Sequence, residues 1–211
     1  TVEGYAAFEN GCSLILYSAI INGPGSVDFL AGSSIDFQGN DKTLGGGLIL
    51  NNYTNILVSF SELLTIDNNA VLNNYGQITF DSSPTITSPF GGNGQFYNES
   101  GGTLISDGTG NPLFDTELQF YNFGDISVYS QIRMDSYSGS NSGTVTISSG
   151  AELNGNADMY FSGTDFTNNG TVNLPRLDFS GSSNQNLNGT GSINFLSITG
   201  GATVFLNGDQ T

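Results

Sequence analysis

The stretch Leu72-Asn73-Asn74-Tyr75-Gly76-Gln77-Ile78-Thr79-Phe80 decides the fold of this chain. It places apolar residues at alternate positions, interrupted once by an Asn-x-Gly step. Such alternation is typical of short β-strands with one buried face. Asn and Gly tolerate left-handed and other unusual backbone angles, so the step predicts a corner between two strands.

The same pattern recurs along the chain. Clear copies run over 120–128 and 166–174, and weaker copies begin at Phe8, Leu50 and Leu187. We call the Asn of each copy its anchor; in the last copy Gly takes this place. The anchors stand at positions 10, 52, 74, 98, 122, 141, 168 and 189. With the first gap counted as two turns, the anchors define eight turns of about 22 residues each. The gaps on either side of position 141 are uneven, which predicts loops or bulges near 130–165.

Each copy is too small to bury its apolar face alone, so successive copies are expected to stack through parallel backbone hydrogen bonds. The sequence therefore predicts an all-β fold, a right-handed parallel β-helix of about nine coils. Asn side chains at equivalent corners are expected to form a ladder. Composition is uniform throughout, which favours one domain over residues 1–211. The absence of capping signals near Thr1 and Thr211 favours a segment of a longer chain.

Charge excludes several classes of partner. The chain has 3 basic and 19 acidic residues, for a formal net charge of -16. Nucleic acids and anionic membrane surfaces need clustered Lys and Arg, so neither is an expected partner. The longest apolar stretch near the start, residues 13–21, is too short to cross a bilayer, so no direct membrane insertion is expected.

The single cysteine, Cys12, has no partner for an internal disulfide. It alternates with apolar residues, which predicts an inward-facing, buried structural thiol. Intermolecular pairing or reactivity is the alternative.

The residue inventory argues against an enzyme. There is no His, which removes the commonest general acid-base group. A lyase acting on acidic sugars needs a cationic clamp, and Arg133 and Arg176 meet only if they share a face about two coils apart. Solvated surface arginines are the simpler interpretation. No catalytic residue is assigned.

A glycosidase needs only two suitably spaced carboxylates. The candidate pairs are Asp28 with Asp36, Asp115 with Glu117, and Asp158 with Asp165. Each alternates with apolar neighbours, which predicts solvated carboxylates on outward strand faces.

Weak calcium binding fits so acidic a surface, because Ca²⁺ prefers hard oxygen ligands. Gly91-Gly92-Asn93-Gly94 is a partial match to the glycine-rich calcium repeat but lacks its Asp. No metal-ligating residue and no cofactor are assigned.

Four tyrosines mark the one candidate ligand-binding feature. Each sits beside an anchor Asn in successive copies: Tyr53, Tyr75, Tyr97 and Tyr121. The first two follow their Asn and the last two precede it, which predicts two stacked pairs rather than one stripe. Their neighbours point inward, so the rings are expected to point outward, where amphipathic rings serve recognition. Cross-coil stacking that only stabilises the corner is the competing interpretation.

Residues 189–204, together with Asn-Asn-Gly-Thr-Val at 168–172, resemble β-helical repeats of secreted, adhesin-like surface proteins of the Bacteroidota, which are exported by type IX secretion. The chain shows no type IX sorting domain. A weaker resemblance is to the β-helical domains of yeast cell-wall adhesins, which also carry paired cysteines that this chain lacks. Four Asn-x-Ser/Thr sequons would be glycan acceptors in a eukaryotic host: Asn52, Asn98, Asn169 and Asn188. Both resemblances imply a role at a cell surface.

The sequence therefore favours a noncatalytic, secreted, structural or adhesive segment that contacts surface glycans and self-associates end to end. The alternative is a carbohydrate-binding or carbohydrate-active β-helix of the lyase or hydrolase kind. An ice-binding solenoid is disfavoured, because no regular Thr-x-Thr file recurs at constant spacing.

Overall fold

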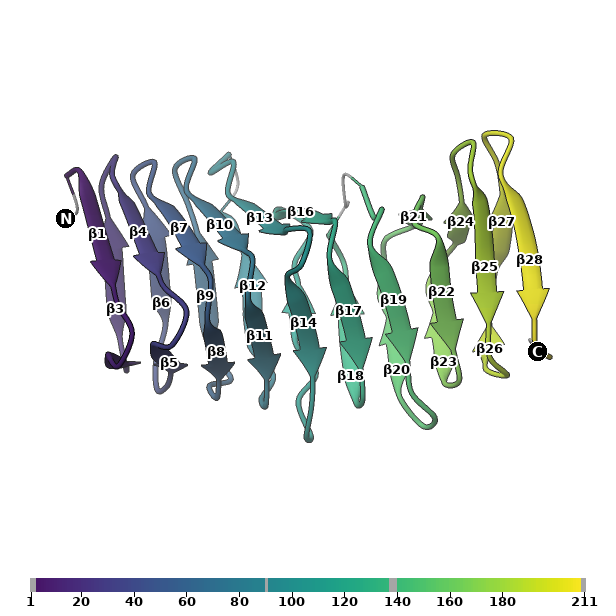
Figure 1. Ribbon diagram of the computed structural model, residues 1–211, viewed down its shortest axis with the longest axis horizontal. Helices are drawn as coiled ribbons and strands as arrows, with labels where there is room; N and C mark the ends of the chain where they lie inside the picture. The colour runs from purple at the N-terminus through teal and green to yellow at the C-terminus, as the bar shows by residue number, and fades with distance from the viewer. Residues whose placement is uncertain (1–2, 90, 137–139, 210–211) are drawn as a thin grey trace.

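The computed structural model describes residues 3–89, 91–136 and 140–209. These residues form 28 short β-strands that coil into a β-solenoid of about nine turns, with β1 at one end and β28 at the other (Figure 1). Every strand pair in its sheets is parallel, which confirms the predicted all-β solenoid. The described part of the chain contains no helix able to span a membrane.

Successive turns add strands to three sheets, named A, B and C. Sheet A contains β1 (Tyr5–Phe8), β4 (Ser26–Phe29), β7 (Ile49–Asn52), β10 (Val71–Asn74), β13 (Gln95–Asn98) and β16 (Gln119–Asn122). Sheet B contains β2 (Ser13–Leu16), β5 (Ser34–Phe37), β8 (Asn55–Val58), β11 (Gln77–Phe80), β14 (Thr103–Ser106), β17 (Asp125–Val128), β19 (Thr144–Ile147), β22 (Asp165–Asn168), β25 (Asn184–Asn188) and β28 (Thr203–Asn207). Sheet C contains β3 (Ala19–Asn22), β6 (Lys42–Gly45), β9 (Leu63–Ile66), β12 (Thr85–Thr87), β15 (Leu113–Phe114), β18 (Gln131–Met134), β20 (Glu152–Asn154), β23 (Thr171–Asn173) and β26 (Ser192–Ile193). A three-stranded sheet, β21 (Met159–Phe161), β24 (Leu177–Phe179) and β27 (Leu196–Ile198), continues from sheet A through bridges at Asn141.

The coil length follows from the register of sheet B. Leu14 and Leu206 stand at the two ends of one inward file that runs through all ten strands of this sheet. Equivalent positions in successive coils are about 21 residues apart, as expected for a solenoid repeat. Inward and outward positions alternate along the strands, as in β13, where Phe96 is buried and Tyr97 is half-buried. Each strand thus contributes its apolar face to one continuous core.

Phenylalanines fill the middle of that core. The Phe114 ring, fully buried in β15, lies parallel to the Phe96 ring at 5.8 Å between centroids and packs at 4.7 Å against Phe120. These three residues come from sheets C and A of adjoining coils, so their contacts hold sheets as well as coils together.

The predicted asparagine ladder is present at the inner edge of sheet A. Asn52, Asn74, Asn98 and Asn122 are fully buried, and each of the first three donates its side-chain amide to the side-chain carbonyl of the next, at 2.7, 2.8 and 2.7 Å. The same amides also donate to backbone carbonyls of the following strands of sheet B. The ladder therefore satisfies the buried amides of Asn52, Asn74 and Asn98, whereas the buried side-chain nitrogen of Asn122 has no hydrogen-bond partner among the described residues.

Three anchors assigned from the sequence, Asn10, Asn168 and Gly189, lie outside this ladder, and Gly189 stacks on Asn168 after sheet B. The position equivalent to Asn52 in the two preceding coils is occupied by Phe29 and Phe8, so Asn10 is not part of the ladder. Asn168 ends β22 of sheet B, whereas Asn141 pairs with Asn122 of sheet A. The long gap between Asn141 and Asn168 therefore compares two different corners, and it is not evidence for an inserted loop.

The glycine of the Asn-x-Gly step was expected to allow an unusual backbone angle, but the structure gives another reason for it. Gly143 does not have a positive φ; instead, a Cβ there would lie 1.7 Å from the carbonyl oxygen of Gly124 in the preceding coil. Gly124 is restricted in the same way by Gly102, at 2.2 Å. Close approach of coil backbones therefore explains these glycines. Left-handed angles occur at other corners, such as Gly150 (φ 80°) and Asn69 (φ 59°).

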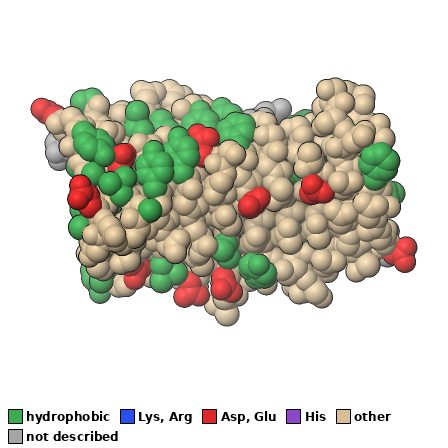
Figure 2. All heavy atoms as spheres, viewed as in Figure 1, with side chains coloured by type: hydrophobic (Ala, Val, Ile, Leu, Met, Phe, Trp, Pro, Cys, Tyr) green, Lys and Arg blue, Asp and Glu red, His purple; other side chains and the backbone are tan. Residues whose placement is uncertain are grey.

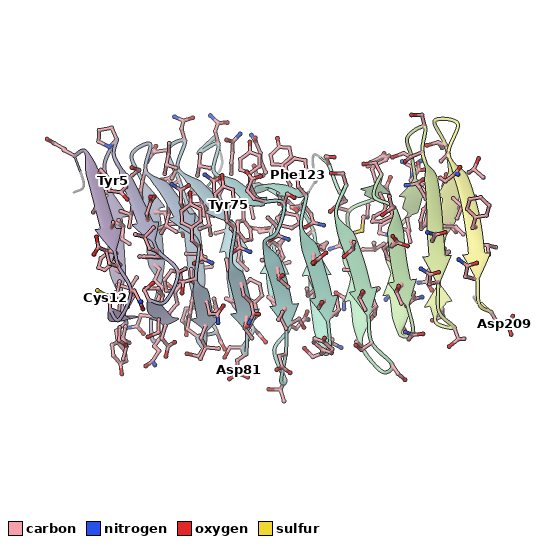
Figure 3. All side chains as sticks on the ribbon, viewed as in Figure 1. Tyr5, Cys12, Tyr75, Asp81, Phe123 and Asp209 are labelled. Atoms are coloured by element: carbon pink, nitrogen blue, oxygen red, sulfur yellow. The ribbon has the colours of Figure 1, made fainter. Side chains whose placement is uncertain are left out.

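The prediction of a buried Cys12 is wrong, because Cys12 is exposed. The prediction that Cys12 faces inward agrees with the register, because the equivalent residues one and two coils further on, Ser33 and Thr54, are only 6% and 7% exposed. Cys12 belongs to the first described coil, and no described coil covers its outer side (Figure 3).

Candidate functional site

The four predicted tyrosines all lie on the outer side of sheet A. Tyr97 and Tyr121 are in register within β13 and β16, and each projects outward between buried neighbours. Tyr53 and Tyr75 follow β7 and β10 directly, at the corner towards sheet B, and are 40% and 38% exposed. Figure 2 shows hydrophobic and acidic side chains interspersed along the upper part of the amino-terminal half.

The rings form the two stacked pairs that were predicted. The centroids of Tyr53 and Tyr75 are 4.9 Å apart, those of Tyr97 and Tyr121 are 4.7 Å apart, and the planes in each pair differ by 8°. At these separations each ring covers one face of its partner. Stacking thus contributes to coil packing. Tyr53 and Tyr75 remain 40% and 38% exposed, whereas the Tyr121 hydroxyl donates to the side-chain oxygen of Gln119 at 3.4 Å.

Sequence reasoning missed two residues of the same corner, Glu99 and Phe123. Each follows an anchor Asn, as Tyr53 and Tyr75 do, so the signal was present in the sequence. Phe123 is 37% exposed, and its ring lies 6.5 Å from that of Tyr97 with an 11° angle between planes. Figure 3 shows Tyr75 and Phe123 on the same upper side of the solenoid.

Polar side chains surround the rings on the outer side of sheet A. Asp28 accepts hydrogen bonds from the amide of Asn51 at 2.8 Å and from the hydroxyl of Tyr5 at 3.0 Å. Asn73 donates to Asn51 at 2.9 Å, and Gln95 donates to Gln119 at 3.0 Å. Rings flanked by amides and carboxylates are suited to ligands with both apolar faces and hydroxyl groups.

The hydroxyls of Tyr75 and Tyr97 are neutral donors across the physiological range. Burial raises the pKa of Tyr75, and the Glu99 carboxylate and Tyr53 raise it further. Burial also raises the pKa of Tyr97, with additional contributions from Tyr121 and Glu99. Glu99 is therefore electrostatically coupled to both stacked pairs.

Arg133 and Arg176 do not form a clamp. Arg133 lies in β18 of sheet C and pairs with Asp135 at 2.8 Å. Arg176 precedes β24 and pairs with Asp158 at 2.8 Å. The two arginines thus occupy different sheets, and each is neutralised by a carboxylate of this chain.

Lys42, the third basic residue, is only 2% exposed. Its ammonium donates to the backbone carbonyls of Tyr17, Gln38 and Asn40 and lies 3.9 Å from the centroid of the Phe60 ring. Burial lowers the pKa of Lys42. This cation is engaged in holding a corner of the solenoid.

In each of the three acidic pairs, at least one carboxylate is engaged by a neighbouring side chain of this chain. Asp28 lies in β4 of sheet A and Asp36 in β5 of sheet B. Asp158 is paired with Arg176, whereas Asp165 in β22 accepts a hydrogen bond from Asn186 at 2.9 Å. The third pair, Asp115 and Glu117, shares the turn before β16, where Asp115 accepts from the Thr87 hydroxyl at 2.8 Å. Within the described ranges, no group of three or more Asp, Glu, Cys or His side chains is placed to hold a metal ion.

A polar depression lies on sheet C, away from the tyrosines. It is lined by Asn111, Arg133, Asn154, Gly155, Asn156 and Asn173. These lining residues offer amides and a guanidinium, and the carboxylates of Asp135 and Glu152 bond to Arg133 and Asn173 at its edge.

Burial separates the four sequons into two kinds. Asn52 and Asn98 are fully buried in the ladder, so neither side chain is accessible as a glycan acceptor in the folded protein. Asn169 is exposed and Asn188 is half-buried.

Comparisons with protein-family models, with curated proteins and with solved structures give no match to this chain. Its function is therefore inferred from its own geometry.

Proposed function

We propose that this chain is a noncatalytic segment of a secreted, cell-surface protein, and that the outer side of sheet A adheres to surface glycans. The observation that carries the proposal is the gathering of Tyr53, Tyr75, Tyr97, Tyr121 and Phe123 on one side of the solenoid. Exposed aromatic rings on a monomer are usually scattered, and a contiguous group marks an interaction surface.

Two features support a sugar as the ligand. Aromatic side chains provide apolar contacts for the C–H faces of a sugar, and the amides of Asn51, Asn73, Gln95 and Gln119 match its hydroxyls. These amides stand in rows along the solenoid, repeating at the strand spacing of about 4.8 Å, which suits an extended polymer better than a small molecule.

Glycan binding is tested with the purified chain on a panel of surface polysaccharides. Tyr97→Ala with Tyr121→Ala is expected to weaken binding about tenfold or more, because the pair supplies two rings of the surface. Tyr129→Ala is the matched control, since Tyr129 is 57% exposed but follows β17 of sheet B. Equal weakening by the control, or no binding by the wild type, contradicts the proposal.

The same proposal includes end-to-end association. The outermost described coils expose apolar side chains beside unpaired strand edges: Ile20 is 77% exposed in β3, and Leu206 is 60% exposed in β28. Parallel strand edges of this kind accept a further strand. Sedimentation over a hundredfold range of concentration is expected to show association, which Leu206→Lys should suppress; a monomer at every concentration contradicts it.

A further inference from the structure

One corner of sheet A contains a break in its aromatic file. Tyr53, Tyr75, Glu99 and Phe123 follow one another in successive coils, since Tyr75, Glu99 and Phe123 each donate their backbone N–H to the anchor Asn of the coil before. The first, second and fourth of these residues are aromatic, whereas the third, Glu99, carries a carboxylate. Tyr75 and Phe123 are thus two coils apart, about 10 Å at the usual strand spacing.

The break places Glu99 between the aromatic positions of Tyr75 and Phe123. One face of Tyr75 is covered by Tyr53, so its other face is directed along the file towards the coil of Glu99. Phe123 lies on the far side of Glu99, and Tyr97, in the same coil as Glu99, is nearly parallel to Phe123. We call these four residues, Tyr75, Tyr97, Glu99 and Phe123, the acidic slot.

Glu99 has no internal counter-charge. Among the described residues its carboxylate has neither a hydrogen bond nor an ion pair, and its side chain is half-buried. The three basic side chains of the chain are engaged elsewhere: Lys42 by carbonyls, Arg133 by Asp135 and Arg176 by Asp158. The chain therefore leaves the Glu99 carboxylate available to a cationic group of a ligand.

A carboxylate flanked by aromatic faces is suited to an ammonium group. The carboxylate accepts a charge-assisted hydrogen bond, and the ring faces attract the cation through their quadrupoles. The net charge of -16 adds long-range attraction for a cationic polymer.

We propose that the acidic slot binds the protonated amine of an amino sugar within a surface polysaccharide. This inference rests on the proposed glycan-binding function and specifies its ligand class as glycans with free amino groups. A basic peptide is a poorer fit, because the neighbouring rows of sheet A carry the amides of Asn51, Asn73, Gln95 and Gln119, which match hydroxyls, and few further carboxylates.

The test compares two oligomers of equal length by calorimetry at low salt, one of glucosamine and one of N-acetylglucosamine. The wild type is expected to bind the glucosamine oligomer at least about tenfold more tightly, because acetylation removes the cation. Glu99→Gln should abolish this preference, and Phe123→Leu, which keeps an apolar side chain but removes the ring face, should reduce it severalfold. Glu62→Gln, a matched charge change on an exposed residue before β9, should leave it unchanged.

The other outcomes overturn the inference in distinguishable ways. If both oligomers bind equally and Glu99→Gln has no effect while the Tyr97 and Tyr121 variant still weakens binding, the glycan function stands and the amine assignment fails. If Glu62→Gln acts as strongly as Glu99→Gln, the preference reflects net charge and not the slot. If oligolysine binds through Glu99 and neither sugar oligomer binds, the partner is a basic protein and both proposals fail.

Discussion

The side-chain amide of Asn74 donates a hydrogen bond to the side-chain carbonyl of Asn98 at 2.8 Å, across 24 residues of sequence. The two residues are directly opposite each other in β10 and β13. Each also satisfies a backbone carbonyl of the next strand in sheet B, so the contact joins two coils and two sheets. Replacing either asparagine therefore affects several buried polar groups at once.

Asn98→Ala is expected to lower the free energy of unfolding by about 2–4 kcal/mol, because the substitution leaves the buried amide of Asn74 and the carbonyl of Asp125 without this partner. Asn73→Ala, on the outer side of the same sheet, should cost less than about 1 kcal/mol. Urea unfolding followed by circular dichroism measures both; equal losses would show that the ladder is not specially stabilising.

Gly143→Ala is expected to destabilise the solenoid by about 3 kcal/mol or more, since the added methyl group overlaps the Gly124 carbonyl of the preceding coil. Gly150→Ala provides the contrast. Gly150 lies in open space but has a φ of 80°, so its loss should be limited to about 1–2 kcal/mol of backbone strain. Melting temperatures of the two variants give the comparison, and the reverse order would contradict close approach as the cause.

Phe120→Ala and Phe123→Ala separate stability from binding within one coil. Phe120 is fully buried, so its truncation should cost about 3–5 kcal/mol. Phe123 is 37% exposed, so its truncation should cost at most about 1 kcal/mol while weakening glycan binding. Thermal unfolding and calorimetric titration, performed on the same preparations, distinguish the two effects.

The ion pair between Asp135 and Arg133 is expected to make the stability of the protein depend on pH in the acidic range. Partial burial opposes the shift, but hydrogen bonds from Arg133 and Asn156 hold the pKa of Asp135 below its usual range. A carboxylate with a lowered folded-state pKa stabilises the protein above its unfolded-state pKa, and this stabilisation is lost as pH falls through the folded-state value.

Asp135→Asn should lower the free energy of unfolding near pH 7 by about 1 kcal/mol or less, because solvent screens the charge of Arg133. This difference from the wild type should be constant near pH 7 and vanish between about pH 4 and pH 2. Denaturant titrations at several pH values measure it. A difference that persists at pH 2 would assign the effect to packing.

Cys12 should react stoichiometrically with a thiol reagent in the folded chain without denaturant, because it is exposed. Absorbance of the released chromophore measures the reaction. Slow labelling that accelerates on unfolding would place the thiol in a protected environment and contradict the exposed position.

The sequence by itself determined the solenoid, the asparagine ladder and the outward pairing of the tyrosines. Alternating apolar residues in a short unit that recurs along the whole chain have only one efficient way to bury their apolar faces, which is to stack coil upon coil. The pairing of Tyr53 with Tyr75 and of Tyr97 with Tyr121 followed because each pair keeps the same offset from its anchor Asn.

Only the tertiary structure decided which corner each repeat belongs to. Asn-x-Gly steps occur both after sheet A, at Asn74, and after sheet B, at Asn168, and the local pattern is the same at both. Register is fixed by backbone hydrogen bonds summed over whole sheets, so the exposure of Cys12 and the separate corners of Asn74 and Asn168 emerge only when the coils are aligned in space.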